Sequence, residues 1–291
     1  VAVFSQEDRF ALHRFKADEA YLVGKGKTPV HAYLDIEDLL RIAEQAHCDG
    51  VHPGYGFLAE QPAFARACIA AGLTWVGPSP DVMETLGNKV AARALAQRAN
   101  VPVCPATTAL PRDPALVRKL AAQIGFPLMV KASWGGGGRG TRVVPSAGEL
   151  DDLLATARSE ALTAFGNDEC YLEKIVRNAR HIEVQIVGDL HGNLVHLFER
   201  DCTVQRRHQK VVERAPALFL TDARRSVLYE YALAIGRMVG YQNAGTVEFL
   251  EDVDTGAFYF IEVNPRIQVE HTVTENITGI DLVKAQILIA G

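Results

Sequence analysis

Two acidic residues late in the sequence are spaced to meet across a β-hairpin. Glu248 and Glu262 lie in apolar, strand-like segments on either side of the turn sequence Asp-Val-Asp-Thr-Gly. If the turn centres on Thr255, the two acids are equidistant from it and face each other. Facing carboxylates repel unless a cation lies between them, and oxygen ligands favour Mg²⁺ or Mn²⁺. We therefore expect Glu248, Glu262 and Asn264 to bind a metal ion. The alternative is a solvated strand face, which a register shift of one residue would produce.

A glycine-rich segment at 135–140 is the second feature with chemical meaning. Its spacing matches a dinucleotide-binding loop, but a β-branched strand follows at 141–144 instead of the required helix, and no Gly-Lys-Ser/Thr ends it. Adjacent glycines let backbone N–H groups approach an anion closely, and Lys131 and Arg139 add positive charge. The pattern predicts a flap that covers phosphate groups. A flexible surface hairpin is the alternative.

Further polar residues surround these two features in the sequence. Arg266, Gln268 and Glu270 alternate onto one side if their segment is extended, and they offer a cation, an amide and a base. The segment 199–210 is a dense basic cluster in a chain of net charge −5. Such a run is usually a solvated face, but beside a phosphate flap and a metal hairpin it indicates a wall of an anion pocket.

The elements that would position these residues can be predicted from the pattern of apolar residues. Strands and helices alternate up to residue 78, which predicts a parallel α/β sheet with functional loops at the carboxyl ends of its strands. One helix is expected over 83–99 and a domain boundary over 100–106, where prolines break the pattern. An α+β unit and then a mostly stranded region follow. Beyond the boundary we expect helices at 114–122, 147–163, 222–239 and 281–289, and strands at 127–131, 141–144, 171–174, 181–187, 194–198, 246–250 and 258–263.

Composition limits the classes of protein that fit. Of the 291 residues, 48% are hydrophobic and 22% charged, which is ordinary for a globular chain. The net charge of −5 argues against binding nucleic acid or anionic membranes through bulk charge. No apolar run is long enough to span a bilayer, and the five cysteines show no metal or disulfide spacing, so we expect a cytoplasmic protein. The chain opens in a strand-like segment and ends after a helical one, so we expect further residues at both ends.

Taken in order, these motifs resemble a biotin carboxylase of the ATP-grasp superfamily. The motifs are Lys89, Lys131 with the glycine run, Glu173-Lys174, Lys210, Glu248 and Glu262-Val263-Asn264-Pro265-Arg266-Ile267-Gln268-Val269-Glu270-His271. The resemblance covers nearly the whole chain and implies an ATP-grasp fold preceded by an incomplete Rossmann-like α/β domain that lacks its first strand. The implied regions are a pre-ATP-grasp domain at 1–86, a connecting helix at 87–103, a lid subdomain with the glycine flap at 104–176, and a body with metal and bicarbonate sites at 177–291, whose C-terminal part is missing.

The resemblance also implies a role for individual residues. ATP would be bound by Lys89, Lys131, Gly137, Gly138, Glu173, Lys174, Val176, His181, His208, Glu248 and Glu262, and the metal by Glu248, Glu262 and Asn264. Bicarbonate would be held by Lys210, Arg266, Gln268, Val269 and Glu270, and biotin would face His52, Tyr55 and Gly56. Arg266, Glu270 and Lys210 would be catalytic. Glu270 would deprotonate bicarbonate for attack on ATP, carboxyphosphate would form, and Arg266 would stabilise the anionic ureido oxygen of biotin.

The implied cofactors are ATP, Mg²⁺ or Mn²⁺, and biotin on a carrier domain outside this chain. The implied partners are bicarbonate, that carrier domain, a carboxyltransferase domain and further copies in a homo-oligomer, with no nucleic acid and no membrane. Several short sequence segments, such as Lys131-Ala132-Ser133-Trp134 before the glycines, resemble those of the bacterial pyruvate carboxylases more than those of the acyl-CoA enzymes. This resemblance implies carboxylation of pyruvate to oxaloacetate. An acetyl-CoA or acyl-CoA carboxylase, a carbamoyl-phosphate synthetase and a non-catalytic nucleotide-binding module are the alternatives. Thr141 and Ala59 depart from the family, which usually has Met and Ser there.

Overall fold

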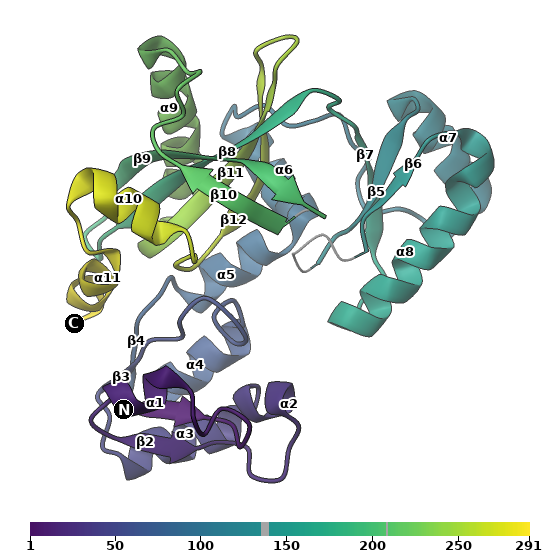
Figure 1. The fold of residues 1–291 in the computed structure, drawn as a ribbon. Coiled ribbons are helices and arrows are strands. Elements are labelled where there is room, and N and C mark those ends of the chain that lie inside the picture. The colour runs from purple at the N-terminus through teal and green to yellow at the C-terminus, as the bar shows by residue number, and fades with distance from the viewer. Residues whose placement is uncertain (135–139, 208) are drawn as a thin grey trace.

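The computed structural model describes residues 1–134, 140–207 and 209–291. Three regions are visible in space: an N-terminal region in purple and blue, a small α+β subdomain in teal, and a larger body around a five-stranded sheet (Figure 1). The subdomain stands apart from the body in Figure 1, and the glycine-rich segment falls between β5 and β6 in the sequence. The sites discussed below come mainly from the body and from its junction with the subdomain.

The N-terminal region contains short strands and helices in alternation, as expected. Its elements are β1 (Ala2–Phe4), α1 (Leu12–Lys16), β2 (Ala20–Leu22), α2 (Pro29–Tyr33), α3 (Ile36–Gln45), β3 (Gly50–Val51), α4 (Pro62–Ala70), β4 (Thr74–Trp75) and α5 (Pro80–Gly87). The strand pairs are parallel, β1 with β2 and β3 with β4. The single sheet that we predicted is nevertheless wrong, because these described strands form two separate ladders.

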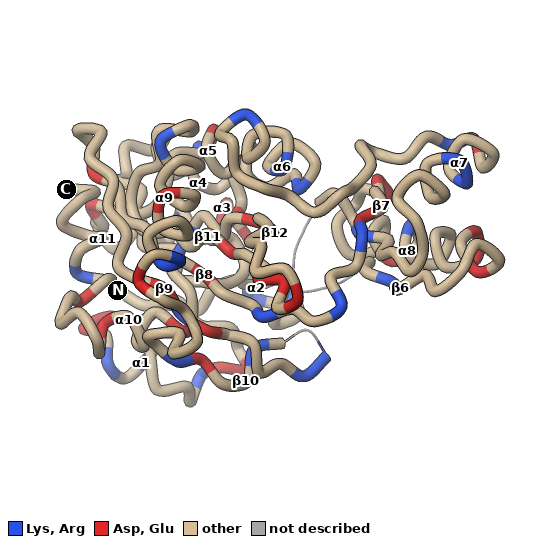
Figure 2. Tube along the Cα trace, turned by 90° about the horizontal axis from the view of Figure 1, so that it is seen from above, with Lys and Arg blue, Asp and Glu red and all other residues tan. Residues whose placement is uncertain are grey.

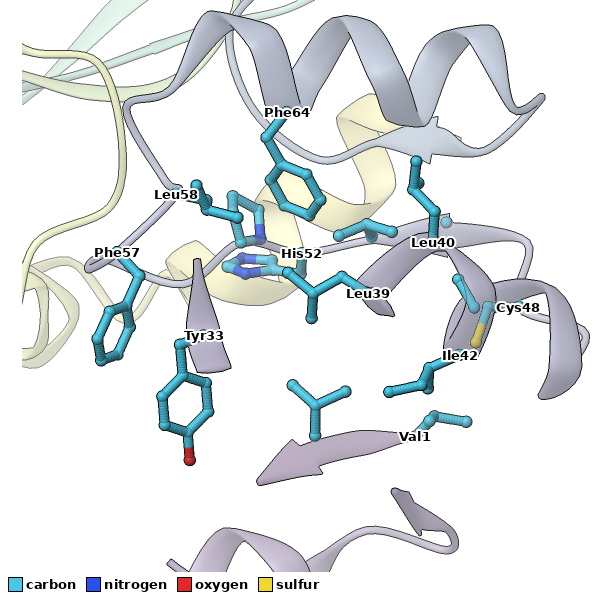
Figure 3. Close-up of a pocket in the computed structure, with 15 residues that line it drawn as sticks. Val1, Tyr33, Leu39, Leu40, Ile42, Cys48, His52, Phe57, Leu58 and Phe64 are labelled. Carbon is cyan, nitrogen blue, oxygen red and sulfur yellow. The ribbon is translucent and has the colours of Figure 1, made fainter. Parts of the chain in front are cut away.

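An apolar cavity lies between the two ladders. It has a volume of about 210 Å³ and is lined by Val1 and Val3 of the first ladder, by Gly50 and Val51 of the second, and by side chains of α3 such as Leu39. Figure 3 shows apolar side chains pointing into this space from both sides. The ladders are therefore held together by side-chain contact around the cavity and not by backbone hydrogen bonds between described strands.

The helix predicted over 83–99 is in fact two helices. α5 ends at Gly87, and α6 (Lys89–Arg98) begins after Asn88, whose backbone is extended. The Asn88 side chain accepts a hydrogen bond from Ala91 N at 2.9 Å, because asparagine is a strong helix N-cap. The break makes Lys89 the first residue of α6, where its side chain reaches β12.

The α+β subdomain is a three-stranded antiparallel sheet with order β6-β5-β7 and two helices. Its elements are α7 (Pro114–Ile124), β5 (Leu128–Ala132), β6 (Arg142–Val144), a short 3₁₀ helix η1 (Ala147–Glu149), α8 (Leu150–Phe165) and β7 (Cys170–Lys174). Leu128, Val130 and Ala132 of β5 point into the core, so Lys131 points to the opposite face. The antiparallel pairing of β5 and β6 confirms a hairpin around the glycine run, whose residues 135–139 lie outside the described residues.

The body is built on one antiparallel sheet with strand order β10-β9-β8-β11-β12. Its elements are β8 (Ala179–Gly188), β9 (Leu194–Arg206), β10 (Gln209–Arg214), α9 (Asp222–Met238), β11 (Asn243–Asp252), β12 (Phe258–Asn264), α10 (His271–Thr278) and α11 (Leu282–Ala290). One face of the sheet packs on α6 and α9 and forms the largest hydrophobic core. The other face carries polar side chains, because alternate residues of β8 and β11 must point away from the core.

Two local expectations in the body need correction. β9 continues to Arg206, well past the predicted end at residue 198, so most of the basic cluster lies on β9, which pairs with β10. Residues 265–270 form a turn that leads into α10, so Arg266, Gln268 and Glu270 do not alternate along an extended segment. Glu270 immediately precedes the first residue of α10, and burial of Ile267 in a small apolar cluster holds the turn against the sheet.

A substitution at Gly188 tests the packing at the end of the β8–β11 ladder. A Cβ atom at this position would lie 2.1 Å from the backbone oxygen of Tyr241, which a flexible side chain cannot relieve. We expect Gly188→Ala to lower the free energy of unfolding by about 2 to 3 kcal/mol through overpacking. Gly87→Ala is the matched control, because nothing lies within 4 Å of its added Cβ. Equal stabilities of the two variants in urea unfolding would contradict the packing described here.

Candidate active site

The register of the body's sheet puts four charged residues in one row across four strands. Arg200 on β9 pairs with Glu183 on β8, Glu183 pairs with Glu248 on β11, and Glu248 pairs with Glu262 on β12. The predicted opposition of Glu248 and Glu262 is therefore confirmed. Nearer the turn, a bulge between Glu248 and Phe249 shifts the pairing by one residue, so the ladder is not as regular as a count from Thr255 implies.

Lys210 on β10 is the positive charge at the centre of this row. Its Nζ lies 2.7 Å from Glu248 Oε1, 2.7 Å from Glu270 Oε1, and in contact with Glu183 Oε2. Burial lowers the pKa of Lys210, but the charges of Glu248 and Glu183 outweigh it and raise the pKa above its ordinary value. In the same way, burial opposes ionisation of Glu248 and Glu270, yet nearby positive charge holds both pKa values below normal. Lys210, Glu248 and Glu270 are therefore ionised at neutral pH.

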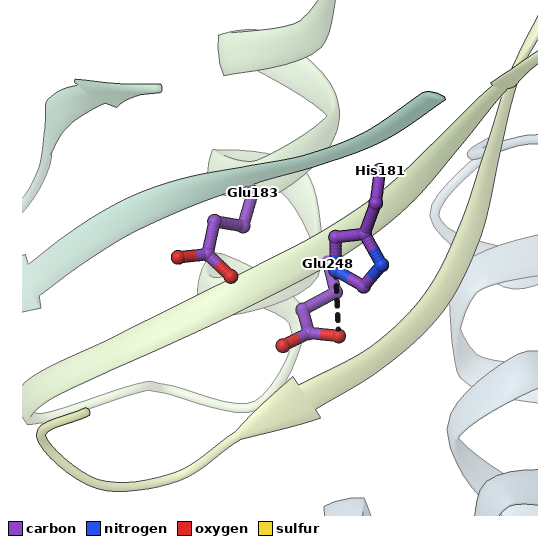
Figure 4. Close-up of side chains that lie close together, drawn as sticks. All are labelled: His181, Glu183 and Glu248. Atoms are coloured by element: carbon purple, nitrogen blue, oxygen red, sulfur yellow. Dashed lines mark ion pairs between the residues drawn. The ribbon is translucent and has the colours of Figure 1, made fainter. Parts of the chain in front are cut away.

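Glu248 is the carboxylate with most partners in the cluster. Figure 4 shows it below His181, with Glu183 beside them on β8. His181 Nε2 lies 3.0 Å from Glu248 Oε2, although not aligned for a good hydrogen bond. Burial disfavours the charged imidazole, but the Glu248 carboxylate raises the pKa of His181 above its ordinary value. Asn264 Nδ2 and Gln268 Nε2 donate to Glu248 Oε1 at 2.9 and 3.3 Å.

The donor set around Glu248 fits a hard divalent ion. One ligand atom each from His181, Glu183 and Glu248 lies within 4.8 Å of the others, and Glu262 faces Glu248 across the ladder. Carboxylate oxygens in this number are what Mg²⁺ and Mn²⁺ prefer. Asn264 turns its Nδ2 to Glu248 and its Oδ1 to Arg266 Nη2 at 3.2 Å, so its oxygen is already engaged.

A second set of ion pairs lies where the subdomain meets the body. Lys89 of α6 pairs with Glu262 of β12, and Lys131 of β5 pairs with Glu173 of β7. Glu173 also accepts from Arg93 Nη1 at 2.8 Å, and both side chains are almost fully buried. Carboxylates therefore already orient the cations at this junction. The pair of Lys89 with Glu262 joins α6 to the body's sheet, and the pair of Lys131 with Glu173 lies within the subdomain.

The remaining predicted site residues lie at greater distance from this cluster or outside the described residues. Lys174 points away from Glu173 and donates to Gly125 O at 3.1 Å, while Val269 is 63% exposed on the turn before α10. In the N-terminal region His52 contacts Gln286 of α11, and Tyr55 and Gly56 are exposed. Val176 is half-buried just after the end of β7, and Gly137, Gly138 and His208 lie outside the described residues.

Arg266 connects the turn before α10 to the N-terminal region. Its Nε lies 2.6 Å from Glu60 Oε1, and its Nη2 donates to Asn264. Glu60 follows the segment that contains Tyr55 and Gly56 by only a few residues. The predicted biotin-facing segment and the predicted catalytic arginine therefore lie on neighbouring parts of the structure.

Sequence reasoning missed Glu183 and Arg200, two fully buried members of the charged row. Glu183 lies two residues after His181 on one strand, so a period of two could have placed it on the same face. Arg200 was part of the basic cluster but had no local signal that separates it from its charged neighbours. Lys and Arg lie close to Asp and Glu along β9 and β10, as Figure 2 shows, so charge type alone does not single out one arginine.

Comparison with known families agrees with the fold and the site. The family model described as "Carbamoyl-phosphate synthase L chain, ATP binding domain" matches residues 88–291, and the model described as "Biotin carboxylase, N-terminal domain" matches residues 1–83. The chain belongs to this class of biotin carboxylase and ATP-grasp proteins, which confirms the resemblance seen in its motifs.

Within this class, the chain is similar to pyruvate carboxylases. The pyruvate carboxylase of Bacillus subtilis (strain 168) is 53% identical over 290 residues, which cover 100% of this chain and 25% of that protein. The mitochondrial pyruvate carboxylase of Homo sapiens is also 53% identical, with 100% and 24% covered. The chain therefore spans about a quarter of the length of these relatives.

Solved structures show the same similarity in three dimensions. Rhizobium etli pyruvate carboxylase T882A with the allosteric activator acetyl coenzyme-A is 58% identical with a TM-score of 0.95, over 99% of this chain and 26% of that one. The Campylobacter jejuni biotin carboxylase–beta-gamma-ATP complex is 43% identical with a TM-score of 0.94, over 99% and 64%. Separately, no helix among the described residues has the length and hydropathy to cross a bilayer.

Replacement of Lys210 tests the electrostatics of the cluster. Lys210→Met leaves three carboxylates without their shared ammonium, and we expect a loss of about 3 to 5 kcal/mol of stability at neutral pH in metal-free buffer. Because the folded-state pKa values of Glu248 and Glu270 lie below normal, their ionised forms contribute stability that is present above about pH 4.5 and lost as the pH falls through the folded values. The deficit of the variant should therefore shrink on acidification.

Urea unfolding with a chelator, at about pH 7.5 and about pH 4, measures this difference. Lys119→Met on the exposed face of α7 is the control and should change stability little at either pH. A deficit that is independent of pH would contradict the ionised cluster.

Proposed function

We propose that this chain carries out the biotin carboxylase half-reaction, in which ATP and bicarbonate are used to carboxylate biotin on a carrier domain. The observation that carries this proposal is the buried cluster in which Lys210 meets Glu183, Glu248 and Glu270. A lysine and a base side by side, next to further carboxylates, suit the binding and activation of a small anion beside a metal–nucleotide complex. The family, and the sequences of relatives named as pyruvate carboxylases, point to the same reaction.

Each region of the structure is proposed to have its own role in this reaction. We assign residues 1–86 to a Rossmann-like pre-ATP-grasp domain, 87–103 to a connecting segment, 104–176 to the lid with its glycine flap, and 177–291 to the body. The parallel ladders of the N-terminal region and the helix that begins at Lys89 support the first boundary. ATP would bind between lid and body, with phosphates near Lys89 and Lys131, and its adenine near the segment from Glu173 to Val176.

Glu248 and Glu262 are the residues that would hold the divalent ion, with Asn264 once its oxygen leaves Arg266. When bound, the metal supplies charge neutralisation for the phosphates of ATP. Gly137, Gly138 and His208 complete the proposed nucleotide site, together with His181. The proposal for the metal is supported by the oxygen-rich row described above.

Glu270 is the proposed base, and its contact with Lys210 supports a coupled action. Lys210, Arg266, Gln268 and the backbone of Val269 would hold bicarbonate. An anion that draws the Lys210 ammonium away from Glu270 removes the charge that keeps its pKa low, so the carboxylate becomes a stronger base as the substrate binds. Deprotonated bicarbonate would attack the γ-phosphate of ATP and break its bond to the β-phosphate oxygen, so that ADP leaves and carboxyphosphate forms. Lid closure would shield this intermediate from water.

The biotin ring would approach from the side of His52, Tyr55 and Gly56. Arg266 would stabilise the negative ureido oxygen as the ring is carboxylated. The pair between Arg266 and Glu60 supports this placement, because it brings the arginine next to the same N-terminal segment. The carrier domain and a carboxyltransferase domain are proposed to belong to the same full-length polypeptide, which forms a homo-oligomer in the cytoplasm and carboxylates pyruvate to oxaloacetate.

The function is tested by its dependence on substrates. ATP cleavage by the full-length protein should require bicarbonate and should increase with free biotin. In Glu270→Gln we expect kcat to fall about 100-fold or more while the affinity for ATP changes by less than about twofold, because the lost group acts on bicarbonate. Phosphate release measures the rate, and Glu230→Gln on the exposed side of α9 is the control. Full bicarbonate-dependent activity in Glu270→Gln would refute the assignment of the base.

The metal site is tested by binding alone. In Glu248→Gln we expect the affinity for Mn²⁺ in the presence of ADP to fall about tenfold or more, because one hard anionic ligand is lost. Calorimetry or electron spin resonance measures the affinity. Glu213→Gln on β10 removes a carboxylate from the same sheet and should leave Mn²⁺ binding unchanged. An unchanged affinity in Glu248→Gln would place the ion elsewhere.

A further inference from the structure

Arg200 is the largest fully buried side chain in the described structure, and it is charged. It extends from the middle of β9 onto the polar face of the sheet. Burial lowers its pKa and the carboxylate of Glu183 raises it, with a net shift upward, so the guanidinium stays charged. A buried arginine with so many polar contacts is costly to assemble, which raises the question of what those contacts hold in place.

The guanidinium reaches five side chains from four different segments. Its nitrogens donate to Glu183 Oε1 at 2.6 Å, Gln185 Oε1 at 2.8 Å, Thr274 Oγ1 at 2.8 Å, Thr246 Oγ1 at 3.2 Å and Gln268 Oε1 at 3.1 Å. The planar fork of arginine matches this arrangement, whereas a lysine ammonium has three donors at one point. Arg200 therefore joins β8, β11, α10 and the turn before α10.

The contact with Gln268 determines which end of that amide faces the cluster. Because Arg200 is only a donor, it requires the Gln268 oxygen, and the amide nitrogen must then point the other way. That nitrogen donates to Glu248 Oε1 at 3.3 Å. Gln268 thus presents a hydrogen-bond donor to the place where Lys210 also lies, which suits a small anion.

The contact with Thr274 fixes the end of the same turn. Thr274 lies in the first turns of α10 and is fully buried, and its hydroxyl accepts from Arg200. Gln268 and Thr274 are therefore held by one guanidinium on either side of Glu270. Because both neighbours are held in place, Glu270 has little freedom to move relative to Lys210.

The contact with Arg200 keeps the buried Glu183 carboxylate paired with a positive charge when Lys210 moves. Glu183 is fully buried, with one oxygen on Arg200 and the other on Lys210. An anion that takes the ammonium from Glu183 would leave a buried carboxylate, which is costly without a second cation. Arg200 remains in contact with it and is the only described arginine within hydrogen-bond distance of Glu183.

We propose that Arg200 is a positioning residue of the anion subsite: it orients the Gln268 amide with its nitrogen toward the site and keeps Glu183 paired while Lys210 binds the anion. This inference rests on the proposed bicarbonate-dependent function and adds a residue that does not touch the substrate.

The first test uses Arg200→Lys in the full-length carboxylase that contains this chain. The variant keeps the charge but loses the fork. We expect the KM for bicarbonate in ATP cleavage to rise about tenfold or more, with the KM for ATP within about twofold of wild type. Arg225→Lys is the matched control, because Arg225 pairs with Glu199 on the same strand but the opposite face, and its KM for bicarbonate should not change.

A second pair of variants leaves Arg200 in place. Gln268→Glu should raise the KM for bicarbonate more than Gln268→Ala does, because one carboxylate oxygen stays on Arg200 and the other turns an acceptor toward the anion. In the Gln268→Ala background, Arg200→Lys should raise the KM for bicarbonate by a smaller factor than it does in the wild type, because the amide that Arg200 orients is already gone and the lysine keeps a charge near Glu183. The comparison of Gln268→Glu with Gln268→Ala keeps Arg200 in both variants, so it tests the orientation of the amide even if Arg200→Lys does not fold.

The outcomes separate the two levels of inference. A wild-type enzyme without bicarbonate-dependent ATP cleavage overturns the proposed function and this proposal with it. An active wild type overturns this proposal alone if Arg200→Lys has an unchanged KM for bicarbonate, if both KM values rise equally, if the effects of Arg200→Lys and Gln268→Ala multiply, or if Gln268→Glu behaves like Gln268→Ala.

Discussion

The site depends on the contact of one ammonium group with three carboxylates in a largely buried place. Glu183, Glu248 and Glu270 come from different strands and a turn, and each would be costly to ionise there alone. Lys210 lowers that cost for all three, while its own charge is stabilised by theirs. Hydrogen bonds from Arg200, Asn264 and Gln268 and the ion pair with His181 add to these contacts, so the cluster is a network and not a set of isolated pairs.

The pleat of the sheet makes this network possible. Alternate residues of β8 and β11 build the hydrophobic core against α6 and α9, and the residues between them face the opposite side. The apolar half of each strand therefore anchors the polar half in a fixed position. A side chain on such a strand has little freedom to relax, which is the condition under which fixed charges and dipoles act most strongly on a substrate.

Cations elsewhere in the structure are also paired with carboxylates. Lys89 at the start of α6 reaches β12, Lys131 and Arg93 share Glu173, and Arg266 reaches Glu60 in the N-terminal region. Each proposed phosphate-binding or biotin-facing cation is thus held by a carboxylate from another element. Such pairs orient the cations before a ligand competes for them.

Local pattern was enough to predict the hairpin that pairs Glu248 with Glu262, the antiparallel strands around the glycine run, and helices such as α7 and α9, because these follow from residue periodicity and turn chemistry within a short segment. It was not enough for the break at Asn88 or the turn at 265–270, where a helix cap and the burial of Ile267 override the pattern. It also did not predict that the N-terminal strands form two separate ladders. Nor could it single out Glu183 and Arg200. Their roles arise from the order of strands in the sheet, which brings residues 183, 200, 210, 248 and 270 together. Pairing between strands so distant in sequence is decided by the packing of the whole domain. The residues next to each strand in the sequence therefore do not indicate which strand it pairs with.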